Sequence, residues 1–110
     1  MSDLYELTAL ELAERIESRE LSPVEVIRAV QRRLDETEPI LNAFISRTDE
    51  QALADATRAE QEIMAGRYRG PLHGVPVAIK DNIAVAGTIT TAGAKFLRDN
   101  RTTEDAEAVR

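Results

Sequence analysis

The segment that most constrains the fold is the six-residue run VPVAIK at positions 75–80. Its first five residues carry no charge, a pattern that is typical of a strand buried on both faces in a sheet covered by helices. Pro76 suits the beginning of such a strand or an irregular pairing, because proline has no N–H to donate to a neighbouring strand. Turn-forming residues precede the run, and Asp81-Asn82 follows it. The chain is therefore predicted to contribute a strand to a sheet.

Helices are predicted before this strand, and the first two have strong start signals. Thr8 is a suitable N-cap, and Glu11 is placed to complete a capping box with it. Ser22 is the second N-cap, with Pro23 at the first helical position and Glu25 placed to complete another box. These signals predict helices that begin directly after Thr8 and Ser22.

The ends of the helices are also predicted from single residues. The second helix should end at Thr37-Glu38, since Pro39 disfavours the α conformation of the residue before it. A third helix should open at Thr48 and stop at Gly66. Apolar positions at helical spacing predict the buried faces. They are Leu12, Ala13 and Ile16 in the first helix, Val26, Ile27, Val30 and Leu34 in the second, and Ala52, Leu53, Ala56, Ala59 and Ile63 in the third.

Two short segments are harder to interpret. Residues 41–45 are apolar enough for either a brief strand or a packed connector, and periodicity does not decide between them. Residues 105–110 have the pattern of the first turn of a last helix, capped by Thr102 or Thr103. Because an isolated helix of this length is marginal, we expect the chain to be cut short rather than finished. The predicted fold class is α/β, with N-terminal helices packed on the start of a mixed β-sheet.

The composition disfavours several function classes. With 110 residues the chain allows one small domain, and its net charge of -6 argues against a phosphate-backbone partner. It contains no cysteine, which excludes disulfides and thiol nucleophiles and fits a cytoplasmic protein. No apolar run approaches the roughly 18 residues of a membrane span, and the acidic N-terminus is unlike a signal peptide. A zinc site is disfavoured, because His73 is the only histidine.

Lysine is rare, and one lysine occupies a position that suggests chemistry. The chain has 12 arginines but only two lysines, Lys80 and Lys95. Unlike arginine, lysine can lose its proton when it is desolvated, and the neutral amine can act as a general base. Lys80 ends the predicted strand, and open α/β sheets bind their ligands at strand ends. A solvated strand end is the alternative interpretation of Lys80, whereas Lys95 is interpreted as a surface charge and His73 as a loop residue.

The stretch from Gly70 to Ala94 reads GPLHGVPVAIKDNIAVAGTITTAGA, and it resembles the opening block of the amidase-signature family. The helix start at 22–25, the connector at 41–44 and the terminal segment at 103–106 resemble the family's N-terminal region in the same order. The resemblance therefore covers nearly the whole chain. Ala94 departs from the family, which often has serine at this position, but the position is not one of the catalytic groups.

The resemblance implies a domain and a mechanism. Residues 1–110 would be the N-terminal part of a single amidase-signature domain, with residues 1–65 helical and residues 66–110 at the start of the catalytic core. Family members hydrolyse carboxamides through a Ser–Ser–Lys arrangement, in which a bridging serine held by a cis peptide bond relays a proton. Lys80 would be the final base, and Asp81-Asn82 would have a supporting structural role.

The resemblance also implies what this chain lacks. Both catalytic serines and the oxyanion hole lie further along in the family, and Ser2, Ser18, Ser22 and Ser46 match no catalytic position. The chain should therefore hydrolyse nothing by itself. Lys80 must be shielded from water in the complete protein, since desolvation favours the neutral amine. In the isolated chain, residues 75–79 should expose apolar surface and favour aggregation.

Several functions remain open. The first is a small-molecule amidase, which the form of residues 103–106 slightly favours. The second is the A subunit of a glutamine-dependent amidotransferase, which acts on misacylated tRNA together with partner subunits. The third is a non-enzymatic helical interaction module, and a family member that has lost its serines is a further alternative. No cofactor, metal, membrane contact or direct nucleic-acid contact is expected, and both a homodimer and amidotransferase subunits are left open as partners.

Overall fold

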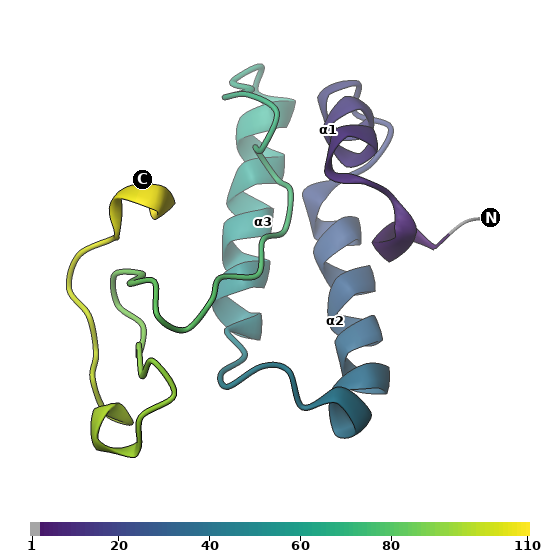
Figure 1. Cartoon of the computed structure of the whole chain (residues 1–110). Helices are drawn as coiled ribbons and strands as arrows, with labels where there is room; N and C mark the ends of the chain where they lie inside the picture. The colour runs from purple at the N-terminus through teal and green to yellow at the C-terminus, as the bar shows by residue number, and fades with distance from the viewer. Residues whose placement is uncertain (1–2) are drawn as a thin grey trace. The chain divides into compact units, whose positions relative to one another are not determined.

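The computed structural model describes residues 3–110, which form two compact units that divide after Pro76. The helices of the first unit are α1 (Ala9–Glu17), α2 (Pro23–Leu41) and α3 (Asp49–Met64), preceded by the short 3-10 helix η1 (Leu4–Glu6) (Figure 1). The second unit contains two 3-10 turns, η2 (Lys95–Leu97) and η3 (Glu107–Val109). None of the helices in residues 3–110 combines the length and the apolar character that crossing a membrane requires.

The predicted helix starts are confirmed at Thr8 and Ser22. The Glu11 N–H donates to the Thr8 hydroxyl at 3.1 Å, and the Thr8 N–H donates to the Glu11 carboxylate at 2.7 Å, which completes the capping box. The N–H donation from Thr8 lowers the pKa of the Glu11 carboxyl. At the second start, the Val24 N–H donates to the Ser22 hydroxyl at 3.0 Å, and the predicted box with Glu25 is not formed among the described residues. The Ser22 hydroxyl in turn donates to Glu60 of α3, so the cap also links α2 to α3.

The predicted end of the second helix at Glu38 is wrong, because α2 continues through Pro39 to Leu41. A proline inside a helix removes one backbone hydrogen bond, and α2 continues for two residues beyond Pro39. The actual end is set by Asn42, which adopts the left-handed conformation with φ 47° and donates its N–H to the Glu38 carbonyl at 2.8 Å. The Glu38 carboxylate then accepts the next two backbone N–H groups, at 3.1 and 2.9 Å. Residues 42–45 form an exposed connector rather than a strand.

The core of the first unit lies where the three helices meet. α2 and α3 run antiparallel, side by side, and Leu12, Ile16, Val26 and Ile63 form a buried cluster between the elements (Figure 1). Ile16 and Val26 are fully buried. The predicted faces are therefore confirmed at their centres, while their edges are half-buried. The half-buried positions are Val30, Leu34, Ala52 and Leu53.

The predicted strand at residues 75–80 is not formed in the part of the chain that the structure describes, so these residues do not show the sheet of the predicted α/β fold class. Among residues 3–110 the only β pairing is an isolated antiparallel bridge between Ile89 and Arg101. A strand is stabilised by hydrogen bonds to a neighbouring strand. Within the part of the chain that the structure describes, the backbone of residues 76–80 makes a single hydrogen bond, in which the Lys80 carbonyl accepts the Ile83 N–H within a turn.

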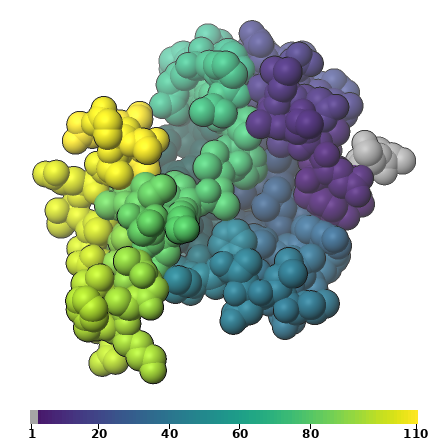
Figure 2. All heavy atoms as spheres, viewed as in Figure 1, coloured from purple at the N-terminus to yellow at the C-terminus, as the bar shows by residue number. Residues whose placement is uncertain are grey.

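The second unit is held together by two antiparallel segments, residues 84–91 and 100–106. The Gly87 N–H donates to the Thr102 carbonyl at 2.8 Å, and the Thr102 N–H donates to the Thr88 carbonyl at 2.9 Å. Most residues of this unit are exposed or half-buried, and its atoms form much of the surface coloured green to yellow in Figure 2. The predicted last helix is a single 3-10 turn, η3, preceded by Ala106 rather than by a threonine cap.

Gly74 provides a test of the packing in the first unit. It has φ +88°, and a Cβ at this position would lie 2.6 Å from Cγ of Pro23. Gly66 has a similar φ of +82° but open space around it. We expect Gly66→Ala to cost about 1–2 kcal/mol of backbone strain, and Gly74→Ala to cost about 1–3 kcal/mol more because of the clash. Urea unfolding of both variants measures the difference, and equal losses would contradict the observed packing.

Candidate active site

Lys80 begins a hydrogen-bonded turn in the second unit. Its carbonyl accepts the Ile83 N–H at 3.0 Å, and its side chain is exposed. The shielding from water that the resemblance requires is therefore not provided by residues 3–110. Val77 and Ile79, on the same run, are 67% and 43% exposed as predicted, whereas Val75 is half-buried against the core of the first unit. Lys95, the other lysine, is exposed in η2 as predicted.

Asp81, which directly follows Lys80, is bonded to Thr91 and Ala92. Its carboxylate accepts the Thr91 N–H at 3.2 Å and also the Thr91 hydroxyl. Its carbonyl accepts the Ala92 N–H at 2.9 Å. Thr91 is one of the two buried polar residues of the described chain, at 8% exposed. These bonds join the predicted Lys-Asp-Asn motif to the Thr-Thr-Ala-Gly motif that follows it.

The turn after Thr91 has an uncommon backbone conformation. Ala92 has φ +50° and Gly93 has φ +76°, so two successive residues lie in the left-handed region. This conformation is free for glycine but costs about 1–2 kcal/mol for alanine. The Gly93 N–H donates to the Thr91 hydroxyl at 3.1 Å, so this hydroxyl both donates and accepts within the turn.

His73 is buried rather than a simple loop residue, and the sequence interpretation missed this. Its Nδ1 accepts the Arg69 N–H at 3.0 Å. Its Nε2 faces a Glu62 carboxylate oxygen at 3.9 Å, and the same oxygen pairs with Arg69 Nε at 3.1 Å. The Arg69–Glu62 ion pair therefore links the loop 69–73 to α3, and His73 braces this loop through the Arg69 N–H. The available signal was the position of the only histidine four residues after Arg69, inside a turn-rich segment.

The serines of the chain have structural roles where the structure describes them. The Ser18 hydroxyl donates to the Arg15 carbonyl at 3.1 Å, and Ser22 caps α2. Ser46 is exposed in the connector, and Ser2 lies outside the described residues. The structure therefore does not bring a serine to Lys80 within residues 3–110. No cluster of three or more His, Asp or Glu side chains that could hold a metal occurs among these residues either.

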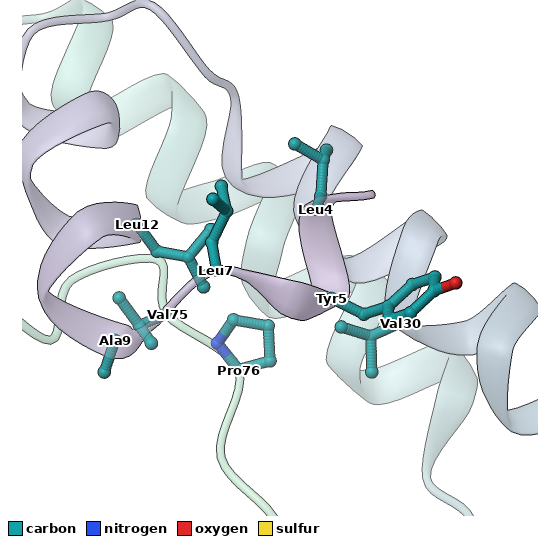
Figure 3. Close-up of a pocket in the computed structure, with 8 residues that line it drawn as sticks. All are labelled: Leu4, Tyr5, Leu7, Ala9, Leu12, Val30, Val75 and Pro76. Carbon is teal, nitrogen blue, oxygen red and sulfur yellow. The ribbon is translucent and has the colours of Figure 1, made fainter. Parts of the chain in front are cut away.

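A pocket in the first unit is apolar (Figure 3). Its lining comes from η1, from α1 and α2, and from the end of the loop that leads to Pro76. The Tyr5 hydroxyl donates to Asp3, and this hydrogen bond raises the pKa of the phenol. Tyr5 is the one titratable side chain among the residues that line this pocket.

The fold of the chain matches part of a solved structure from the amidase signature enzymes. The crystal structure of a bacterial aryl acylamidase of that family is similar, with a TM-score of 0.82 and 32% sequence identity. The match covers 88% of this chain and 20% of that chain. The family model described as Amidase matches residues 25–110. The chain belongs to the amidase family.

Two named relatives show the range of functions within this similarity. The A subunit of a glutamyl-tRNA(Gln) amidotransferase from Lachnospira eligens is 41% identical over 106 residues, which are 96% of this chain. An acylamidase from Rhodococcus erythropolis is 41% identical over 107 residues, which are 97% of this chain. In both cases the chain spans 22% of the length of the relative.

Proposed function

We propose that the complete protein hydrolyses the C–N bond of a carboxamide and that Lys80 is its final base. The observation that carries this proposal is the position of Lys80 inside the segment matched by the amidase family model. The Asp81–Thr91 hydrogen bonds add support, because they fix the residue next to this lysine. A lysine amine can accept a proton only in its neutral form, and arginine cannot replace it in this role.

The proposed chemistry is acyl transfer through serine. The neutral amine of Lys80 accepts a proton from a bridging serine, which accepts one from the nucleophilic serine. The serine oxygen attacks the carbonyl carbon of the amide, the C–N bond breaks, and the leaving amine takes up the proton. Water then attacks the acyl-enzyme, the ester bond to serine breaks, and the serine oxygen takes up one proton of the water as the carboxylic acid is released. Both serines belong to sequence outside residues 1–110, so we expect the chain alone to be inactive.

The proposal also requires a sheet that covers the lysine. Val77 and Ile79 are exposed in the described chain, although both are apolar. Pairing of residues 75–80 with strands from the rest of the domain would bury both side chains and remove water from Lys80. Each fully buried apolar side chain of this size contributes about 1.5–3 kcal/mol, which favours this pairing over an exposed run.

A stand-alone amidase is the first of two candidate functions. This candidate is favoured by the acylamidase from R. erythropolis and by the crystallised aryl acylamidase. The names of both proteins refer to amide cleavage and mention no subunit. An anilide of a short carboxylic acid is therefore the substrate class to test first. The expected products are the free acid and the aromatic amine, in equal amounts.

The A subunit of an amidotransferase is the second candidate, favoured by the 41% identity to the protein from L. eligens. This candidate predicts release of ammonia from glutamine only when partner subunits are present. The two candidates are separated by assaying the complete protein on an anilide and on glutamine, each with and without amidotransferase partner subunits. Anilide cleavage without partners supports the first, and glutaminase activity only with partners supports the second. Cleavage of neither substrate under any condition would overturn the proposed function.

A further inference from the structure

We propose that Asp81 and Thr91 form a positioning pair for Lys80, an inference that rests on the proposed function of that lysine. The pair joins two motifs that are ten residues apart in the sequence. Neither residue is assigned a role in the proton transfers themselves. Their role is to hold the backbone from which the catalytic amine projects.

The geometry of the pair fixes the position directly after the lysine. One oxygen of the Asp81 carboxylate accepts both the N–H and the hydroxyl of Thr91. The Asp81 carbonyl accepts the Ala92 N–H at 2.9 Å, so the same residue is held at its side chain and at its backbone. On the other side, the Lys80 carbonyl accepts the Ile83 N–H. The lysine therefore lies beside two restrained peptide groups.

The hydrogen bonds between Asp81 and Thr91 are energetically favourable. Hydrogen bonds to an ionised carboxylate are about twice as strong as neutral ones. Thr91 is 8% exposed, so its hydroxyl would be left buried without an acceptor for its proton if the bond to Asp81 were lost, although it would still accept the Gly93 N–H. Ala92, whose N–H donates to the Asp81 carbonyl, has a left-handed conformation. Backbone strain of this kind is concentrated at functional sites, where the surrounding structure has to maintain it.

Proton transfer tolerates little displacement of the catalytic group. A displacement of about 1 Å in a catalytic group can cost about 100-fold in rate. Lys80 has a long flexible side chain, so the accuracy of its amine depends on the fixed direction of its backbone. The Asp81–Thr91 pair supplies this fixed direction from within the chain, before any contact from the rest of the domain is considered.

Thr90 provides a matched control for Thr91. The two threonines are adjacent, and replacing either with valine exchanges a hydroxyl for a methyl group of similar size. In the described chain, the hydrogen bonds of Thr90 are made by its backbone. Its N–H donates to the Asn100 carbonyl, and its carbonyl accepts from the side-chain amide of Asn100. Thr91→Ser is the conservative variant, because it keeps the hydroxyl that Asp81 accepts.

The test compares these variants in the complete protein that contains residues 1–110, with an anilide as substrate. We expect Thr91→Val to lower kcat about 10- to 100-fold with KM nearly unchanged. Thr91→Ser and Thr90→Val should keep kcat within about twofold of the wild type. Melting temperatures are measured for every variant. If Thr91→Val is unfolded at the assay temperature, Asp81→Asn replaces it, since this change keeps the shape and removes the charge.

A second readout separates this proposal from the proposed function. Brief acetylation with limiting acetic anhydride, followed by mass spectrometry, gives the ratio of acetylated Lys80 to acetylated Lys95. We expect Thr91→Val to raise this ratio about threefold or more, because the released turn exposes the amine. If the wild type cleaves no amide, the proposed function fails, and the acetylation ratio still decides the positioning role. An unchanged ratio, or equal losses of kcat in Thr91→Val and Thr90→Val, would overturn the pair.

Discussion

Replacing Lys80 with methionine is expected to lower the kcat of the complete protein for amide hydrolysis about 100- to 10,000-fold, the usual contribution of a general base. Methionine resembles lysine in length and flexibility but has no basic nitrogen. The protein should still fold, because the turn at this position is held by the Lys80 carbonyl and not by its side chain. Steady-state kinetics with an anilide measure the loss.

Two further variants show whether the lost function is that of a base. Lys80→Arg keeps the positive charge but cannot provide a neutral amine, so we expect it to lose as much activity as Lys80→Met. Lys95→Met is the matched control at the other lysine, which is exposed in η2, and it should retain wild-type activity. Substantial activity in Lys80→Arg would mean that the charge matters rather than the proton transfer.

A large loss of stability is expected at Ile16. This side chain is fully buried in the cluster with Leu12, Val26 and Ile63. Ile16→Ala removes apolar contacts and leaves a cavity, so we expect it to lower the free energy of unfolding by about 2–5 kcal/mol. Urea unfolding, followed by the loss of helical circular dichroism, measures the change.

Leu10 provides the control, because it lies on the same helix and is 67% exposed. Leu10→Ala should change the free energy of unfolding by no more than about 0.5 kcal/mol. Similar losses in the two variants would show that α1 is not held by the core described above. The comparison thus tests the first unit independently of any catalytic role.

Local signals predicted the helices well. The capping box of Thr8 depends on residues three positions apart, so it is visible in the sequence before any tertiary contact is known. The buried faces were predicted for the same reason, since a period of 3.6 residues fixes which side chains share a face. The end of the second helix was predicted wrongly because only Pro39 was considered. The left-handed Asn42, which actually ends α2, was not.

Contacts between distant residues were not predictable in this way. Two of these contacts join segments whose approach depends on the fold, namely the Ser22–Glu60 bond and the Asp81–Thr91 bonds. The burial of His73 depends on the fold as well. The strand at residues 75–80 is not formed for a related reason. Its apolar pattern indicates a preference for a strand, but a strand forms only when a neighbouring strand pairs with it. The importance of Lys80 came from a family resemblance, and its role stays a prediction.

The most direct test of the central proposal is to read the coding sequence beyond Arg110. We predict that the reading frame continues into a Gly/Ser-rich segment with two serines at the spacing of a Ser–Ser–Lys amidase, which would give Lys80 its partners. A stop codon directly after Arg110 would contradict the proposal, because residues 1–110 would then have to cleave amides without a catalytic serine near the lysine.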